Sequence, residues 1–261
     1  MSERKIDPHP SWDGPARVVG PDAHRWGVYE PHPQSWRASG TSTTLPATRT
    51  TWRASVSTSS PVSYTYTGQL TTEWSIDATV LRTSQYDNYL VFSCFHGVTY
   101  QSLCIQKLGN DYVSLTGNVS VIPEPTEAFE THRTPVNEGP AALYLEGTTY
   151  LAYSASYCWT PYYCVALLPW DSSTEPTSKS AWAKGDSCAL SSAKGNYGTG
   201  HNSFFQSPDA SETWIAYHAT SKSGGACDNT RYTVVRPVGV SNGKLVFETP
   251  AAFSAVFNEP S

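Results

Sequence analysis

Short apolar and aromatic segments alternate with turn-rich segments along most of the chain, which is the pattern of β-strands joined by turns. The segments 88–94, 149–154 and 213–218 show it most clearly, and each follows a run of small and polar residues. No window shows a sustained apolar repeat of 3.6 residues, so we expect few helices. The expected strands are 88–94, 101–107, 149–154, 164–168, 213–218 and 232–236. The sequence therefore predicts an all-β fold.

The same unit of strand, turn and strand occurs three times along the chain. Each unit begins with a polar residue, Asp77, Glu138 or His201, and ends a strand in Phe-Ser, Tyr-Ser or Tyr-His. Asp77 and Glu138 are 61 residues apart, and Glu138 and His201 are 63 residues apart. A repeat of this length, holding about four short strands, is typical of a β-propeller blade with long loops. Because the innermost strand of every blade starts at the central axis, we expect the three polar residues to converge on one pocket.

Composition narrows the classes of partner. The 261 residues suffice for one large all-β domain or two ordinary domains. Only 15% of the residues are charged and 13% are aromatic, which suits β-rich proteins and sugar binders, although we expect most of these rings to fill the core. The net charge of −5 gives no reason to expect a nucleic acid or an anionic membrane as partner.

The even number of cysteines suits an extracellular protein with disulfides, whereas the N-terminus shows no signal peptide for secretion. The spacing of the six cysteines matches no zinc signature. Cys158 and Cys164 flank a short loop and could close it as a disulfide, and free buried thiols are the alternative. The first residues, MSERKIDPHPSWDG, contain no apolar segment of the kind found in signal peptides, and no apolar run approaches the length of a membrane span.

Three motifs carry a resemblance to a known family. They are WSIDATV at 74–80, NEGPAALYLEGTTYLAYSAS at 137–156 and GTGHNSFFQSPDASETWIAYHA at 198–219. In this order and at this spacing, they resemble glycoside hydrolase family 43, whose members are five-bladed β-propellers acting on arabinofuranosides, arabinans and xylosides. The resemblance covers about residues 65–250. It implies an incomplete propeller in this chain, with about three intact blades.

The resemblance also implies roles for the three leading residues. Glu138 matches the general acid, Asp77 matches the carboxylate that tunes the pKa of the acid, and His201 matches an axial histidine near a water molecule or a divalent cation, often calcium. An inverting glycosidase needs one protonated carboxyl for the leaving oxygen, and a nearby ionised carboxylate keeps that group protonated. The alternatives are turn or strand-end carboxylates without a catalytic role, and a buried structural histidine. Candidates for lining the sugar site, with packing as the alternative, are Trp74, Tyr157, Trp159 and Phe204.

The general base is not found. In the family it is an aspartate two blades before the residue that matches Asp77, farther upstream than the 76 residues before Asp77 allow. Asp7, in an Ile-Asp-Pro-His-Pro segment, resembles the Asp-Pro motif around that base, but it lies nearly a blade too close to Asp77.

The N-terminal segment lacks the pattern of a blade. Residues 36–60 are rich in Ser and Thr and have no apolar alternation where a second blade is expected. Many of their codons, read two bases later, would encode the aliphatic and tyrosine residues of two strands. We therefore expect residues 1–64 to be a degenerate or frame-shifted segment that replaces the first two blades, and residues 65–261 to be the propeller domain.

The expected function is inverting hydrolysis of O-glycosidic bonds in arabinan, arabinoxylan or related arabinose- and xylose-containing polysaccharides. The alternative is an inactive propeller that at most binds sugar, because the base and part of the ring are not found. The resemblance implies an extracellular monomer that requires no cofactor, with calcium at the axis as the one candidate ion.

Overall fold

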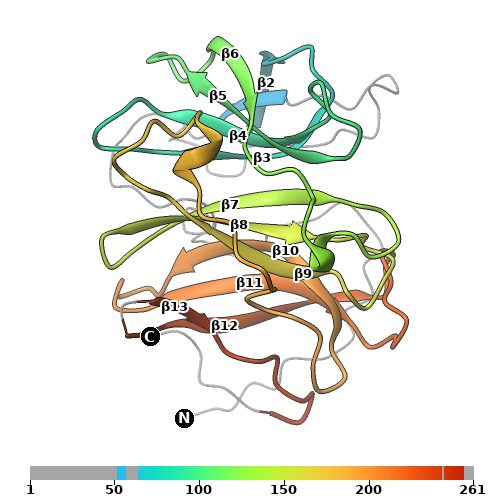
Figure 1. Cartoon of the computed structure of the whole chain (residues 1–261). Helices are drawn as coiled ribbons and strands as arrows, with labels where there is room; N and C mark the ends of the chain where they lie inside the picture. Colours follow the sequence, from blue (N-terminus) through green and yellow to red (C-terminus); the bar gives the residue numbers. More distant parts are fainter. Residues whose placement is uncertain (1–51, 57–63, 243, 256–261) are drawn as a thin grey trace.

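The computed structural model describes residues 52–56, 64–242 and 244–255, which form four antiparallel sheets (Figure 1). The first sheet holds β1 (Trp52–Val56) and β2 (Tyr64–Gln69). The second holds β3 (Ser75–Leu81), β4 (Tyr89–Cys94), β5 (Ser102–Leu108) and β6 (Leu115–Val121). The third holds β7 (Asn137–Leu145), β8 (Thr148–Ala155) and β9 (Cys164–Pro169). The fourth holds β10 (Tyr197–Gln206), β11 (Thr213–Thr220), β12 (Arg231–Ser241) and β13 (Lys244–Phe247).

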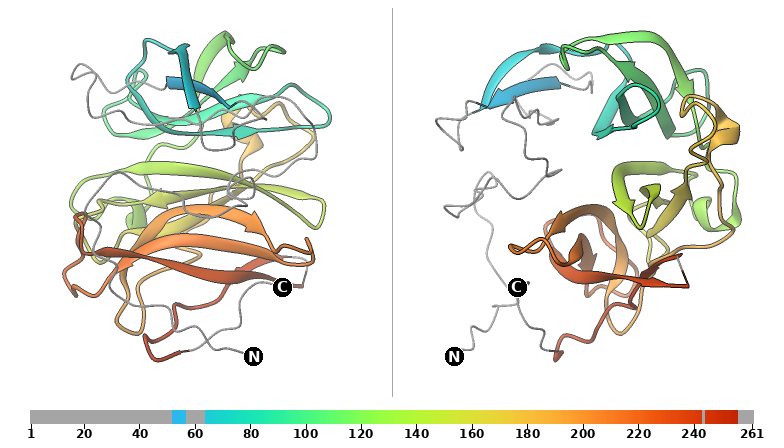
Figure 2. Two further views of the ribbon diagram at one scale, coloured as in Figure 1. Left: turned by 180° about the vertical axis from the view of Figure 1, so that it is seen from behind. Right: turned by 90° about the vertical axis from the view of Figure 1, so that its left-hand side faces the viewer.

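The sheets follow one another around a common axis, as the right-hand view of Figure 2 shows. Within each sheet the strands lie in chain order, and the first strand of one sheet contacts that of the next, β3 with β7 and β7 with β10. This is the arrangement of propeller blades. The all-β prediction and the six expected strands are confirmed, and the described helices are two 3₁₀ turns, η2 (Ala128–Glu130) and η3 (Lys179–Ala181). Within the described ranges, no helix has the length and apolar character needed to cross a bilayer.

The hydrophobic core lies between neighbouring sheets. Strand β4 is buried along its whole length because β3 and β5 flank it and the next sheet covers it. One apolar cluster joins the β3–β6 sheet to the β7–β9 sheet, and a second joins β7–β9 to β10–β13. Most of the largest buried side chains are aromatic or branched aliphatic, so packing explains many of the rings, as expected.

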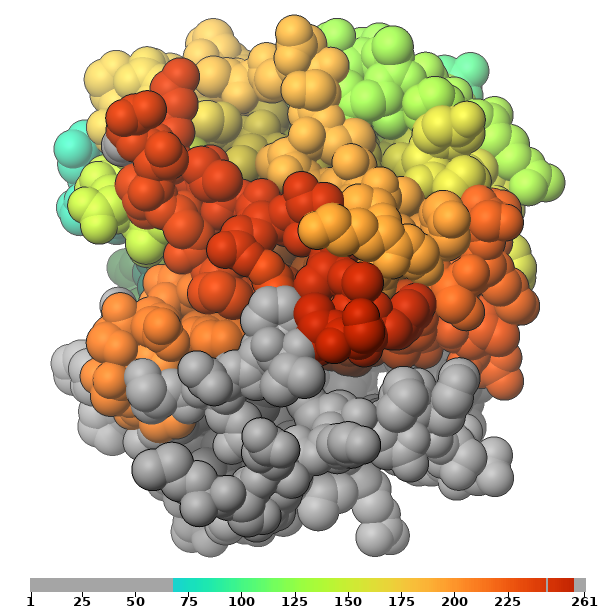
Figure 3. All heavy atoms as spheres, turned by 90° about the horizontal axis from the view of Figure 1, so that it is seen from below, coloured from blue at the N-terminus to red at the C-terminus, as the bar shows by residue number. Residues whose placement is uncertain are grey.

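The connection between β9 and β10 packs against the last sheet. Leu190 belongs to the same buried cluster as Phe247 of β13, and Asn196 donates a hydrogen bond to the carbonyl of Ala251 at 2.8 Å. In the space-filling view of Figure 3, the red C-terminal atoms lie beside the orange-yellow atoms of this connection. Leu190 also pairs with Val165 of β9, so this connection ties the β7–β9 sheet to the last strand of the next sheet.

The innermost strands share one irregularity. The strand register shifts between Ile76 and Thr79, between Glu138 and Ala141, and between Gly200 and Ser203. Asp77 and His201 adopt positive φ angles of 57° and 52° within these shifts. Such angles are uncommon for residues with a side chain, and bulges of this kind redirect side chains at functional positions. The bulge therefore recurs at all three polar residues that lead the sequence repeats.

Serine hydroxyls join each blade to the next at these bulges. The backbone N–H of Gly139 donates to Ser93 Oγ of β4 at 3.3 Å. One blade later, the N–H of His201 donates to Ser154 Oγ of β8 at 2.6 Å. Ser93 and Ser154 are the residues that end the Phe-Ser and Tyr-Ser runs of the sequence repeat. The repeat therefore encodes an inter-blade hydrogen bond as well as the polar residue itself.

The predicted pairing of Cys158 with Cys164, and the alternative of free thiols, are both wrong. The disulfides are Cys94–Cys104, Cys158–Cys227 and Cys164–Cys188. Cys164 is buried at the start of β9 and faces the connection that leads to β10. Cys158 instead lies in the β8–β9 loop, which contacts the β11–β12 loop: a Cβ placed on Gly225 would lie 2.2 Å from the Thr160 carbonyl carbon.

Part of the expected N-terminal segment forms a hairpin. β1 lies in the Ser/Thr-rich stretch and pairs antiparallel with β2, so a strand exists where the sequence pattern predicts none. β2 begins at Tyr64, one residue before the expected domain boundary. Residues 1–51 and 57–63 lie outside the described residues, and the degenerate or frame-shifted origin of this segment stays a prediction.

Candidate active site

Asp77, Glu138 and His201 come together from three consecutive blades. His201 Nε2 lies 3.8 Å from Asp77 Oδ1. A Cβ placed on Gly139 would lie 3.2 Å from His201 Nδ1, so the His201 ring lies against the backbone next to Glu138. Gly139 also has a φ of 58°, which a residue without a side chain adopts at little cost. The structure therefore assembles the three residues that the repeat predicted to share a pocket.

We expect Gly139→Ala to lower the free energy of unfolding by about 1–2 kcal/mol, because alanine at this φ is strained and its methyl group would press on His201. Chemical denaturation of the two proteins measures this. Gly147→Ala is the matched control for the backbone effect alone, since Gly147 has a φ of 76° and a Cβ there would meet open space. Equal losses of unfolding free energy in the two variants would contradict the role of the close approach to His201.

Both oxygens of the Glu138 carboxyl are held by hydrogen bonds. The Tyr163 hydroxyl donates to Oε1 at 2.8 Å, and Gln101 Nε2 donates to Oε2 at 3.0 Å. Burial of the carboxyl raises the pKa of Glu138 above its ordinary value, and the negative charge of Asp77 raises it further. The hydrogen bonds from Tyr163 and Gln101 oppose this effect without cancelling it. Glu138 is thus a carboxyl that stays protonated to a higher pH than an ordinary glutamate.

Gln101 is positioned by the strand that carries Glu138. Residues Gln101 and Val136 form a parallel β-bridge, and the N–H of Asn137 donates to the Gln101 carbonyl at 2.9 Å. Gln101 precedes β5 of one blade, and Asn137 begins β7 of the next. The backbone of this glutamine is therefore tied to Glu138 across the boundary between blades.

Tyr163 is the last residue of the β8–β9 loop and is only 1% exposed. Burial, followed by the charge of Glu138, raises the pKa of the Tyr163 hydroxyl well above its usual value. Tyr163 therefore acts as a neutral phenol. Its ring fits only because position 200 is glycine: a Cβ there would lie 2.2 Å from Tyr163 Cε1.

His218 completes a stack of rings beside Glu138. Its ring is parallel to that of Tyr163, with centroids 5.5 Å apart, and lies 6.4 Å from that of His201. Burial, together with the positive charge of Arg231 and the nearby His201, lowers the pKa of His218 to about 3. His218 is therefore neutral at physiological pH and does not compete with Glu138 as an acid. It ends the Tyr-His run of the repeat, at the position that Ser93 and Ser154 occupy in the preceding blades.

Three of the four predicted sugar-binding rings lie in loops or strand entries at the Glu138 end of the blades. Trp74 precedes β3 and packs edge-on against Phe95, which is 41% exposed. Tyr157 lies under the Arg133 guanidinium, 5.1 Å from its ring centre, and Trp159 is 44% exposed in the same loop as Tyr157. Exposed aromatic faces of this kind suit the CH faces of sugar rings. Their role in sugar binding stays a prediction.

Phe204 does not join this group. Its ring stacks on Phe247 with centroids 6.1 Å apart, within the cluster that joins the last two sheets. The reason is the strand period: Phe204 lies three positions after His201, beyond the bulge, and the pleat turns it toward the core. The structure therefore favours the packing alternative at this position.

The described residues do not provide a protein cage for calcium. Calcium takes 6–8 oxygen ligands, whereas the axis offers the His201 imidazole and one neighbouring carboxylate, Asp77. Within the described part of the chain, no group of three or more His, Cys, Asp or Glu side chains could hold a metal ion. A calcium ion at the axis stays a prediction. Asp7, the distant match to the general base, lies outside the described residues.

Sequence and fold comparisons place these features in a family. The model of "Glycosyl hydrolases family 43" matches residues 33–245. An "Extracellular exo-alpha-(1->5)-L-arabinofuranosidase" of Streptomyces chartreusis is 28% identical over 227 residues, which cover 81% of this chain and 65% of that protein. The protein of the same description from Streptomyces avermitilis is 36% identical over 119 residues, which cover 45% of this chain and 24% of that one.

A solved structure supports the fold independently. The crystal structure of an α-L-arabinofuranosidase from Lactobacillus brevis superposes with a TM-score of 0.71 at 23% identity, covering 79% of this chain and 68% of that one. In the sequence comparisons, the chain spans less than two thirds of the length of either Streptomyces relative. The match to the family model nevertheless extends over most of the sequence and includes all three blades that carry the site. The chain therefore belongs to glycoside hydrolase family 43.

Proposed function

We propose that the protein hydrolyses the O-glycosidic bonds of α-L-arabinofuranosyl units in arabinan or arabinoxylan, with inversion at the anomeric carbon. The observation that carries this proposal is the buried carboxyl of Glu138, held on both oxygens and raised in pKa beside Asp77. Three relatives with arabinofuranosidase names support the choice of sugar. Exposed rings near the site support a carbohydrate ligand.

In the proposed reaction, Glu138 donates its proton to the glycosidic oxygen as the bond to the anomeric carbon breaks. Asp77 keeps Glu138 protonated through its negative charge, and His201, two blades after Asp77, lies 3.8 Å from the Asp77 carboxylate. A second carboxylate, about 6.5–9.5 Å from the acid, would activate water on the opposite face of the sugar. No residue of the chain is assigned to this base.

An extracellular location fits the chemistry of the cysteines. All six form disulfides, which persist in oxidising compartments and are rare in the cytosol. Two of the relatives are named as extracellular proteins. We propose that the protein acts outside the cell, on cell-wall polysaccharide, as a monomer.

Incubation with an aryl α-L-arabinofuranoside and with linear arabinan tests the proposal. We expect turnover, and we expect kcat/KM to fall as the pH rises through the pKa of Glu138, because only the protonated acid can donate a proton. Since burial and Asp77 raise that pKa, the fall begins at a higher pH than for an ordinary glutamate. Binding of arabinan without turnover would contradict hydrolysis and support the sugar-binding alternative.

A further inference from the structure

The loop between β8 and β9 is fastened at both ends by disulfides to two different parts of the chain. Near its start, Cys158 is bonded to Cys227 in the β11–β12 loop of the next sheet. Directly after it, Cys164 is bonded to Cys188 in the connection between β9 and β10. The backbone of residues 158–164 is therefore held in place from both sides.

The same segment folds as two consecutive turns that present aromatic rings. The N–H of Thr160 donates to the Tyr157 carbonyl at 3.1 Å, and the N–H of Tyr163 donates to the Thr160 carbonyl at 3.4 Å. Trp159, within the first turn, is 44% exposed, and Tyr162, within the second, is 56% exposed. Tyr162 is the most exposed of the described tyrosines, although the backbone that carries it is fixed.

The ring of Tyr162 rests on the imidazole of His132. The two ring centroids are 4.0 Å apart and the planes differ by 17°, so the rings are stacked. His132 lies in the segment before β7, and its carbonyl accepts a hydrogen bond from Ser156 Oγ at 3.1 Å. The histidine is thereby tied to the end of β8, and it sets the orientation of the exposed tyrosine ring.

This stack lies at the end of the blade that carries the acid. Ala155, the last residue of β8, pairs with Asn137, which directly precedes Glu138. Tyr163 donates a hydrogen bond to Glu138 Oε1 at 2.8 Å. Because consecutive Cα atoms are about 3.8 Å apart, the Tyr162 ring starts beside the residue that contacts the acid. The buried tyrosine serves the acid, whereas its exposed neighbour lies outside that contact.

An exposed ring on a fixed backbone is suited to binding rather than to folding. A ring that is more than half exposed buries little apolar area in the folded chain. A ring whose orientation is already set loses little conformational entropy when a ligand packs on it. The CH faces of sugar rings are apolar and pack on aromatic faces. The sugar unit at the bond to be broken lies at Glu138, so further units of the same chain are the ones that can reach Tyr162.

We propose that Tyr162, backed by His132, forms an outer sugar subsite that binds a further arabinofuranosyl unit of the polysaccharide chain. This inference rests on the proposed function, in which the substrate is an arabinose-containing polysaccharide. The subsite favours long chains over short ones, since a short chain that occupies the site at Glu138 does not extend to the Tyr162 ring.

The test is titration calorimetry of the full chain carrying Glu138→Gln, in which the sugar is not consumed. This parent protein is expected to bind arabinohexaose more tightly than arabinobiose. Adding Tyr162→Ala should weaken the binding of arabinohexaose about tenfold and that of arabinobiose much less, because only the longer chain packs on the ring. Tyr162→Phe should retain the affinity, since it keeps the aromatic face and loses only the hydroxyl.

Tyr112→Ala is the matched control for removing an exposed tyrosine. Tyr112 is 41% exposed in the connection between β5 and β6, at the end of its blade opposite to Asp77. In the same parent protein, this variant should bind both sugars as tightly as the parent does.

Three results would overturn the subsite. They are no binding of arabinohexaose by the parent, equal affinities of the parent and Tyr162→Ala for arabinohexaose, and equal losses for the two sugars in Tyr162→Ala. Equal losses would mean that Tyr162 acts only by placing Tyr163 at the acid. The titration requires no turnover, so a wild-type chain that fails to hydrolyse arabinan, together with the expected length-dependent loss, would reject the proposed hydrolysis and keep the subsite.

Discussion

Glu138→Gln is expected to lower kcat about 10²–10⁴-fold on arabinan, since the variant keeps the shape of the side chain and loses the proton it would donate. The Tyr163 and Gln101 contacts can persist with an amide at this position, so KM should change little. A dinitrophenyl arabinofuranoside should retain most of its rate, because its leaving group departs without protonation. Steady-state kinetics on the two substrates measures the difference.

Glu146→Gln is the matched control for this loss. Glu146 follows the last residue of β7, at the end of the strand opposite to Glu138, so the same chemical change is made far from the site. It should keep full activity. A Glu138→Gln variant as active on arabinan as the wild type would remove Glu138 as the acid.

The pH dependence of the unfolding free energy of Glu138→Gln tests the raised pKa of Glu138 without relying on turnover. Burial raises the pKa of Glu138 in the folded protein above its unfolded value, so the stability that this group contributes is fully present below the unfolded pKa and is lost as the pH rises through the folded pKa. Glutamine carries no such dependence. The variant should therefore be at least as stable as the wild type at alkaline pH.

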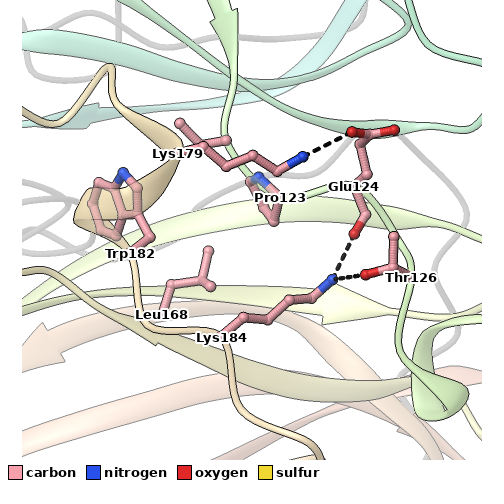
Figure 4. Close-up of a pocket in the computed structure, with 8 residues that line it drawn as sticks. Pro123, Glu124, Thr126, Leu168, Lys179, Trp182 and Lys184 are labelled. Atoms are coloured by element: carbon pink, nitrogen blue, oxygen red, sulfur yellow. Dashed lines mark hydrogen bonds and ion pairs between the residues drawn. The ribbon is translucent and has the colours of Figure 1, made fainter.

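Lys184→Met is expected to lower the free energy of unfolding by about 3–5 kcal/mol, because it leaves a buried carboxylate without its cation. That carboxylate is Glu130, which is fully buried and 2.5 Å from Lys184 Nζ. Figure 4 shows Lys184 reaching from the segment after η3 toward the connection between β6 and β7, where it also contacts Glu124 and Thr126. The remaining donors to Glu130 are the N–H groups of Thr126 and Glu127, the Asn137 amide and the Tyr153 hydroxyl.

Lys179→Met is the control for this prediction, because Lys179 and Lys184 line the same pocket, which Figure 4 shows. Lys179 pairs with Glu124 at 2.8 Å, but its side chain is 61% exposed, and exposed pairs contribute about 0–1 kcal/mol. Denaturant unfolding of the two variants should therefore differ by several-fold in the free energy lost. Equal losses would show that burial does not determine the contribution of Lys184. The pocket itself contains none of the predicted site residues.

The sequence pattern predicts the strands and the three leading residues of the site. Apolar runs bounded by turns determine β4, β8 and β11 closely, because burial on both faces selects aromatic and branched residues there. The near-constant spacing of Asp77, Glu138 and His201 is visible because each blade places its innermost strand in the same way. The residues that end the repeats, Ser93, Ser154 and His218, can also be identified in the sequence, although their hydrogen bonds cannot.

The partners of Glu138 could not be predicted in this way. Gln101 and Tyr163 lie in loops whose paths depend on contacts with other blades, and no periodicity marks them. The disulfides have the same origin: Cys158 meets Cys227, 69 residues away, because two loops pack together. β1 was missed because its composition is that of a linker, and only pairing with β2 makes it a strand.

Every pairing within the three larger sheets joins strands that are neighbours in the chain. Such hairpins form within about 1–10 μs, before slower association of preformed units. The surroundings of Glu138, by contrast, require Gln101 and Asp77 from the preceding blade and His201 from the following one. During refolding, secondary structure should therefore recover earlier than the unusual acidity of Glu138. The protonation of this one carboxyl reports the last stage of assembly, when separately formed blades have come into contact.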